Sequence, residues 1–300
     1  MSSRLAILIA GPTASGKSGL AIELAKNHNG VVINTDSMQV YSILQEITAR
    51  PDEREMDGVE HLLFGHVAPG APYSVAIWME QAANAIDTVR SAGKLPILVG
   101  GTGLYFKAIL EGLSQVPTVD PDIRRKLRDA SLIDVAPLYD ELNVLDPDGA
   151  AKLEPGDTQR IVRALEVVKS TGKSLFDWQS APKSKSVLDG AHCEKIVILP
   201  PRELLNERIA RRFHAMVEKG ALAEVEALME LGLDHEMPAM RAIGVSQLAS
   251  TLKGERELDE MIELSIIATR QYAKRQRTWF RHQFDASWRV LESADEYSAC

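Results

Sequence analysis

One stretch near the N-terminus decides the fold: Gly11-Pro12-Thr13-Ala14-Ser15-Gly16-Lys17-Ser18. It has the pattern of a phosphate-binding P-loop, and it lies between an apolar run and an amphipathic stretch, as that loop requires. The glycines allow the backbone to curl so that its N–H groups point at phosphate oxygens. In this pattern Lys17 reaches the terminal phosphate and the Ser18 hydroxyl ligates Mg²⁺. The stretch therefore predicts a site for a nucleotide or a diphosphate.

The sequence around this loop predicts an α/β fold. Short apolar runs alternate with amphipathic stretches, which is typical of a parallel sheet with crossover helices. The expected strands are 5–10, 31–34, 61–64, 96–99, 195–199 and 288–291. The expected helices are 16–27, 74–91 and 202–219, with more helices up to about residue 283. We therefore expect a P-loop NTPase-like parallel sheet with flanking helices.

The sequence changes character between residues 114 and 193. Proline and aspartate interrupt it, and its periodic segments, about 122–131, 136–145 and 157–170, are helical only. A strand pattern resumes at residue 195. The simplest interpretation is an all-helical insertion domain at 114–193, within a catalytic core formed by 1–113 and 194–300.

Composition narrows the class of protein. The 300 residues are 45% hydrophobic and 25% charged, as in an ordinary globular protein. The apolar runs are too short for a signal peptide or a membrane span. Cys193 and Cys300 match no metal or redox spacing. We therefore expect a cytoplasmic protein with two reduced thiols and no membrane partner, and no surplus apolar element indicates more than a monomer.

Charge is segregated along the chain. The net charge of −8 argues weakly against a nucleic-acid partner. Basic residues nevertheless gather in two segments, residues 270–289 and the group Arg124, Arg125, Lys126 and Arg128. The pattern of residues 274–281 alone favours a solvated basic helix face with two core aromatics.

The usual acidic companion of a P-loop is missing. An NTPase has a second apolar strand that ends in an acidic residue for Mg²⁺, but here residues 95–99 lead into Gly100-Gly101-Thr102-Gly103. Asp36 instead follows a neighbouring strand, at the sheet edge where such folds bind ligands. It is a candidate general base or metal helper, and the alternative is an N-cap aspartate of the next helix. The bound phosphate is then better explained as a group by which the substrate is held, or as a leaving group, than as a source of energy through hydrolysis.

Six motifs together resemble those of one family. They are Gly11–Ser18 (GPTASGKS), Asp36–Tyr41 (DSMQVY), Gly100–Phe106 (GGTGLYF), Arg160–Val167 (RIVRALEV), Arg241–Gly244 (RAIG) and Lys274–Phe280 (KRQRTWF). In this order they resemble the bacterial tRNA dimethylallyltransferases, and the resemblance extends from about residue 5 to residue 281. The family transfers a dimethylallyl group from dimethylallyl diphosphate to N6 of the adenine that is 3′-adjacent to the anticodon in tRNA.

The resemblance implies roles for individual residues. Asp36 would accept a proton from the amine, Thr102 would bind the adenine or its neighbour, and Lys17 would neutralise the diphosphate with Mg²⁺ at Ser18. Arg212 would add positive charge there, with a solvated helix arginine as the alternative. The implied tRNA-binding residues are Asp36, Ser37, Met38, Gln39, Thr102, Gln159, Arg160, Ile161, Val162, Arg163, Arg241, Ala242, Ile243, Gly244, Val245, Ser246, Lys274, Arg275, Gln276, Arg277, Thr278, Trp279, Phe280 and Arg281. The insertion would act as a lid or clamp for the anticodon stem-loop.

Some positions depart from the family pattern. Ile47 replaces a glycine, Arg50 replaces a lysine and Val245 replaces an aromatic residue, which affects substrate contacts more than the reaction itself. Three alternatives stay open at this point: a free adenine nucleotide as acceptor, a small-molecule kinase, and a nucleotide-gated binding module.

Overall fold

The computed structural model describes residues 5–298, which form two compact units. The first unit consists of the chain up to Leu110 together with the chain from Val187 on, and the second unit is Glu111–Ser186. Cys193 has a free thiol, and Cys300 lies outside the described residues. No helix within residues 5–298 is both long enough and apolar enough to span a membrane.

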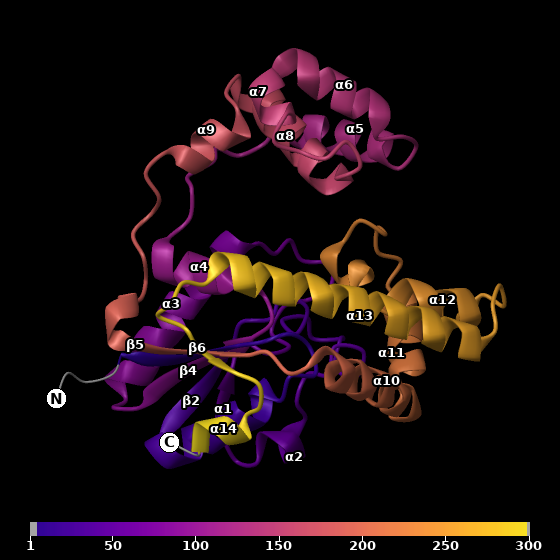
Figure 1. Ribbon diagram of the computed structural model, residues 1–300. Helices are drawn as coiled ribbons and strands as arrows, with labels where there is room; N and C mark the ends of the chain where they lie inside the picture. Colours follow the sequence, from indigo (N-terminus) through magenta and orange to yellow (C-terminus); the bar gives the residue numbers. More distant parts are fainter. Residues whose placement is uncertain (1–4, 299–300) are drawn as a thin grey trace. The chain divides into compact units, whose positions relative to one another are not determined.

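The first unit is built on a six-stranded parallel sheet with the order β3-β2-β4-β1-β5-β6 (Figure 1). The strands are β1 Ala6–Ala10, β2 Gly30–Asn34, β3 His61–Leu62, β4 Leu95–Gly100, β5 Cys193–Ile198 and β6 Arg289–Leu291. This confirms the predicted fold class. β3 is shorter than the predicted 61–64 because Leu63 has a φ of 64°, which turns the backbone out of the extended conformation.

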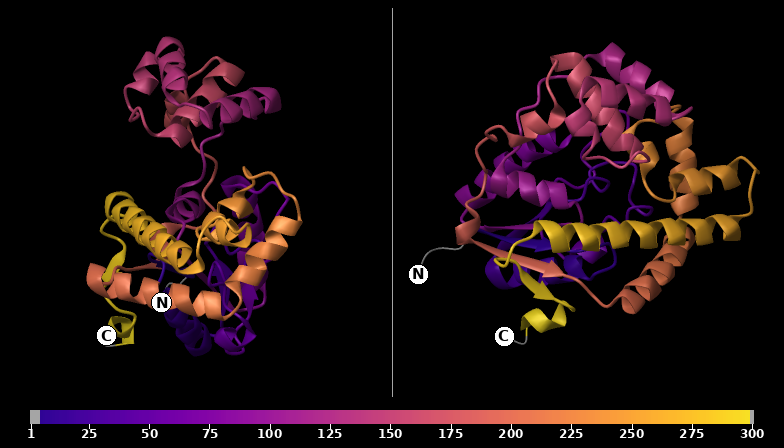
Figure 2. Two further views of the ribbon diagram at one scale, coloured as in Figure 1. Left: turned by 90° about the vertical axis from the view of Figure 1, so that its right-hand side faces the viewer. Right: turned by 45° about the horizontal axis from the view of Figure 1, so that its top comes forward.

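Helices cover both faces of this sheet, so its central strands are apolar throughout. They are α1 Lys17–His28, α2 Glu53–Met56, α3 Val75–Ser91, α4 Gly103–Glu111, α10 Arg202–Glu218, α11 Ala221–Glu230, α12 Val245–Leu252, α13 Leu258–Gln283 and α14 Asp295–Ser298, with 3-10 turns at Gly190–His192 and Pro238–Arg241. Leu8 and Ile33 pack with Trp78 of α3 and Phe280 of α13 on one face, whereas Ile7 and Ile9 pack against α1 on the other. The long α13 can be followed in both views of Figure 2.

The second unit is helical, as its pattern predicts. It contains α5 Pro121–Ser131, α6 Ala136–Leu145, α7 Pro147–Ala150, α8 Thr158–Thr171 and α9 Leu175–Ser180 around a separate apolar core. The aspartates that interrupt its sequence are N-caps: the side chains of Asp120, Asp146 and Asp157 accept backbone N–H groups at the starts of α5, α7 and α8.

The unit boundaries differ from the predicted 114–193. The second unit ends at Ser186 because the next residues return to the sheet-containing core. The N–H groups of Val187 and Leu188 both donate to the Ile109 carbonyl at 3.0 Å, and Leu188 is buried. Because Leu188 is buried in the first unit, the insertion ends before it, earlier than the polar composition up to residue 193 suggests.

Candidate active site

The P-loop leaves β1 and opens α1, with Gly16 in the left-handed region at a φ of 92°. A Cβ on Gly11 would lie 2.6 Å from Ser15 Oγ and 2.9 Å from the Ile198 carbonyl oxygen, so only glycine fits there. Within residues 5–298, the buried Ser15 hydroxyl has no hydrogen-bond partner. It is a polar group that a bound anion would satisfy.

Gln276 of α13 connects this loop to the turn after β4. Its Oε1 accepts the Thr13 N–H at 3.0 Å, and its Nε2 donates to the Gly101 carbonyl at 2.9 Å. The side chain is only 6% exposed. Both ends of the amide are thus used inside the protein, whereas the family resemblance implies a contact of this side chain with tRNA.

Asp36 is not a helix N-cap, because the chain from residue 35 to residue 50 forms turns and no helix. Its Oδ1 accepts the Met38 N–H at 2.9 Å, which closes a side-chain turn. The Asn34 side chain holds the same backbone: its Oδ1 accepts the Asp36 N–H at 2.8 Å and its Nδ2 donates to the Asp36 carbonyl at 3.0 Å. Sequence reasoning missed Asn34, because its burial and its hydrogen-bond partners are evident only once the chain is folded.

Two cations lie in the field of the half-exposed Asp36 carboxylate. Burial lowers the pKa of Lys17 to about 8, an effect that Asp36 opposes and Arg212 reinforces. Burial also lowers the pKa of Arg212 to about 10, again opposed by Asp36. Lys17 Nζ donates to the Pro12 carbonyl at 3.2 Å, and Arg212 donates to the Thr13 hydroxyl. The Thr13 contact makes Arg212 part of the loop's surroundings rather than a solvated helix arginine.

The turn after β4 explains why no acidic residue follows that strand. A Cβ on Gly100 would overlap the backbone of Thr35, and one on Gly101 would overlap the Gln276 amide and lie 3.4 Å from Asp36 Oδ2. Thr102 follows, and its Oγ1 accepts the Ser37 N–H at 3.0 Å and donates to Ser37 Oγ at 3.3 Å. The three strand ends therefore bring the P-loop, Asp36 and Thr102 to one edge of the sheet.

The residues at this edge of the sheet offer Mg²⁺ a single hydroxyl ligand, that of Ser18. Ser18 is exposed at the start of α1, and its side chain has no hydrogen bond to any other described residue. Residues 5–298 contain no group of three or more His, Cys, Asp or Glu side chains that could hold a metal. Mg²⁺ is commonly bound through one or two side chains together with substrate phosphates, so this sparse donor set fits a diphosphate-bound ion.

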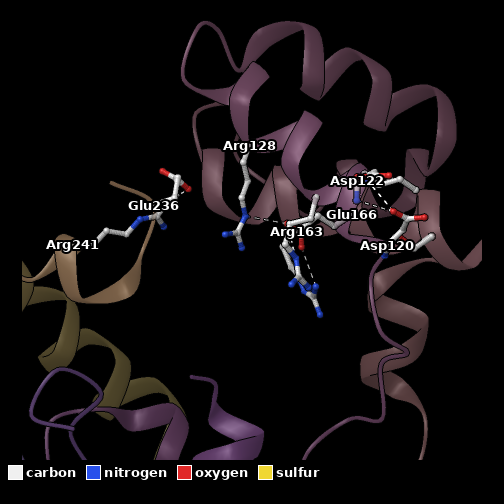
Figure 3. Close-up of polar contacts among 10 residues, drawn as sticks. Asp120, Asp122, Arg128, Arg163, Glu166, Glu236 and Arg241 are labelled. Carbon is white, nitrogen blue, oxygen red and sulfur yellow. Dashed lines mark hydrogen bonds and ion pairs between the residues drawn. The ribbon is translucent and has the colours of Figure 1, made fainter. Parts of the chain in front are cut away.

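The other predicted tRNA-binding residues of the first unit divide by exposure. Arg241, Ser246, Lys274, Arg275, Thr278 and Arg281 are exposed, Ile243 is half-buried, and Ala242, Gly244, Val245 and Phe280 are buried. Arg241 is paired with Glu236 (Figure 3). Arg277 is half-buried and donates to the Pro200 carbonyl, and Trp279 packs where a Cβ of Gly103 would lie. The buried side chains can affect RNA binding only through the neighbours that they support.

The loop that carries Ser37, Met38 and Gln39 is held internally. Gln39 Nε2 donates to the carbonyls of Thr48 and Ala49, at 3.0 and 2.9 Å. The Glu224 carboxylate of α11 accepts the N–H groups of residues 45, 46 and 47. This anchoring fixes the loop that continues from Asp36.

Both departures from the family pattern in this loop are accommodated by internal contacts. Ile47 is buried, and its Cδ1 lies 2.7 Å from the position that a Cβ of Gly244 would take. Arg50 donates to the Ser42 carbonyl at 2.9 Å and lies against Gly65, whose φ is 56°. Ile47 and Arg50 thus make contacts within this chain: Ile47 packs against Gly244, and Arg50 contacts Ser42 and Gly65.

In the helical unit, the predicted residues lie on α8. Gln159 and Arg160 are exposed at its start, Ile161 and Val162 are buried in the unit's core, and Arg163 is half-buried. Only the first two and Arg163 present polar groups to solvent.

Comparisons with known proteins agree with these motifs. A model of the IPP transferase family matches residues 39–283, and one of the isopentenyl transferase family matches residues 5–67. The tRNA dimethylallyltransferase of Rhizobium meliloti (strain 1021) is 50% identical over 291 residues, which cover 97% of this chain and 96% of that protein. That of Rhizobium etli is 54% identical over 288 residues, covering 95% and 96%.

Two of the solved structures that match this chain are also prenyltransferases of tRNA. The tRNA isopentenylpyrophosphate transferase of Bacillus halodurans matches with a TM-score of 0.68 and 35% identity, over 97% of this chain and 90% of that one. A eukaryotic dimethylallyltransferase, described as acting on tRNA, matches with a TM-score of 0.74 and 31% identity, over 92% and 69%.

Proposed function

Because the chain belongs to the IPP transferase family, we propose that it transfers a dimethylallyl group from dimethylallyl diphosphate to N6 of the adenine 3′-adjacent to the anticodon in tRNA. The observation that carries the proposal is the half-exposed Asp36 carboxylate at the P-loop, which interacts electrostatically with the cations Lys17 and Arg212. This is a site for a negatively charged leaving group beside a proton acceptor.

The P-loop and its two cations act on the diphosphate. As the allylic C–O bond breaks, negative charge develops on the leaving oxygen, and the loop N–H groups with Lys17 and Arg212 stabilise it. The unpartnered Ser15 hydroxyl offers a further hydrogen bond. Ser18 would hold Mg²⁺ on the diphosphate, where the ion supplies additional neutralisation of that charge.

Asp36 acts on the acceptor. An exocyclic adenine amine is a poor nucleophile, because its lone pair is delocalised into the ring. As N6 forms its bond to the allylic carbon, its proton passes to the Asp36 carboxylate. The Met38 N–H donates to that carboxylate, and the Asn34 side chain holds the Asp36 backbone. Thr102 accepts a hydrogen bond from the N–H of Ser37, the residue that follows Asp36.

The exposed basic residues of α13 and of the helical unit bind the phosphates of the RNA. Lys274, Arg275 and Arg281 project from α13, and Arg160 from α8. The reacting adenine has to leave the stacked loop to reach Asp36, and basic side chains on the phosphates would hold the stem-loop meanwhile.

We further propose a cytoplasmic monomer. Lys17, Asp36 and Arg212 all come from one chain, so the site needs no second copy. Light scattering on the purified protein would give a mass near 33.0 kDa if this is right.

The reaction is tested by incubating the enzyme with labelled dimethylallyl diphosphate and an anticodon stem-loop RNA. We expect label in the RNA and release of diphosphate, and both should depend on Mg²⁺. Label in free AMP alone, or hydrolysis of ATP, would show that the acceptor or the reaction has been assigned wrongly.

A further inference from the structure

A buried carboxylate organises three arginines in the helical unit. Glu166 of α8 has a side chain that is 3% exposed, and the side chains of Arg124, Arg128 and Arg163 are each 41–42% exposed. Arg163 Nη1 lies 3.0 Å from Oε2, while the Nε atoms of Arg128 and Arg124 lie 3.4 and 3.7 Å from Oε1. Figure 3 shows Arg128 and Arg163 converging on Glu166 from two helices.

This arrangement has more positive charge than a structural ion pair needs. A buried carboxylate is costly unless it is paired, and one well-placed arginine suffices to pair it. Here three guanidinium groups surround one carboxylate, so positive charge remains in surplus. Within residues 5–298, Arg124 and Arg128 have no acidic partner other than Glu166. Because both approach it through Nε, the outer nitrogens of their guanidinium groups are left for another acceptor.

Glu166 also makes the cluster possible. Three guanidinium groups held this close repel one another, and the carboxylate between them offsets that repulsion. Arg128 and Arg163 are held by hydrogen bonds to Glu166, whereas Arg124 is held by the ion pair alone. Half-exposed guanidinium groups held in this way bind phosphate oxygens well, because the planar donor fork matches them and little side-chain entropy remains to be lost.

We propose that Arg124, Arg128 and Arg163 form a binding surface for the RNA phosphate backbone, with Glu166 as its positioning residue. The inference rests on the proposed function, which supplies the tRNA substrate. It adds Arg124 and Arg128 to the RNA-binding residues, and it gives Glu166 a role in affinity for RNA rather than in the chemical step.

Glu166→Gln separates positioning from net charge. The variant keeps the side-chain shape and makes the patch more positive, so RNA would bind equally well or more tightly if only charge mattered. We expect instead about three- to tenfold weaker binding of the anticodon stem-loop by fluorescence anisotropy, with a matching rise in KM for RNA and unchanged kcat. Glu166→Asp should recover part of the loss. Glu141→Gln is the matched control, because it removes the same charge from the exposed Lys169 pair of the same unit.

A second variant covers the case in which Glu166→Gln unfolds the unit, which circular dichroism would reveal. The double substitution of Arg124 and Arg128 by Gln changes only half-exposed side chains. It should weaken RNA binding at least tenfold. The slope of log K for RNA binding against log salt concentration (the salt slope) should become less steep by about two. Arg125→Gln, on the same helix but paired with Asp122, is the control.

The labelling and binding measurements distinguish a wrong reaction from a wrong RNA-binding surface. If wild-type enzyme does not label the stem-loop, the proposed function is wrong. If wild-type enzyme labels it, and the double variant binds RNA with an unchanged affinity and salt slope, the arginine surface alone is wrong. Unchanged or tighter RNA binding by folded Glu166→Gln would likewise overturn the positioning role.

Discussion

The two units each contain a carboxylate among cations, but the carboxylate is half-exposed in the first unit and buried in the second. At the sheet edge, Asp36 is half-exposed and burial lowers the pKa of Lys17 and of Arg212. In the helical unit Glu166 is buried and its arginines reach solvent. A half-exposed carboxylate can meet a substrate, whereas a buried one can only position its partners. The same charges therefore favour proton transfer beside a bound diphosphate in the first unit, and anion binding alone in the second.

Replacing Asp36 tests the first half of this comparison and should have the largest effect. Asp36→Ala removes the proton acceptor, and we expect single-turnover transfer to slow by about two or more orders of magnitude. Asp36→Asn should be as slow, although its amide oxygen can still accept the Met38 N–H. Diphosphate affinity, measured by calorimetry, should hold or increase, because a negative charge is lost. Normal turnover in both variants would remove Asp36 from the reaction.

Gln276 tests whether α13 serves the reaction centre or the RNA. Gln276→Leu leaves the Thr13 N–H and the Gly101 carbonyl without partners, and we expect about a tenfold loss of turnover with weaker diphosphate binding. Stem-loop affinity should stay within twofold of wild type in anisotropy measurements. The reverse pattern, normal diphosphate binding with weak RNA binding, would restore Gln276 as an RNA contact.

The pH dependence of diphosphate binding tests the enclosed cations. The anion favours protonated Lys17, whose pKa of about 8 in the free protein means that the charge is lost as the pH rises through 8. We expect affinity to be constant below that pH and to fall by up to about tenfold per unit above it. Calorimetry at several pH values measures this. Lys17→Arg, which stays protonated, should give a flatter profile, and parallel profiles for the two proteins would contradict the assignment.

Lys274 should give the smallest effect. It is an exposed residue of α13, so Lys274→Ala should weaken stem-loop binding about threefold and reduce the salt slope by about one. Turnover at saturating RNA should not change. An unaltered salt slope would mean that this face is only solvated, and the arginines of the helical unit would then carry more of the RNA affinity.

Much of the fold and part of the site could be predicted because the signals are local. The P-loop has a fixed spacing, strands and helices have their periods, and Asp36 follows a strand directly. Asn34, Gln276 and Glu166 could not be assigned in this way, because their roles depend on partners brought near by the fold. Gln276 shows the difference: its neighbours in sequence are basic, but its contacts are Thr13 and Gly101.

The bond between Thr13 and Gln276 joins residues 263 positions apart. During translation the P-loop emerges long before the side chain that completes it, because 263 positions separate the two residues. A nascent chain cut short before α13 would therefore have the loop's sequence without its finished shape. Substrate binding would thus be expected only after α13 has been synthesised and has folded onto the loop.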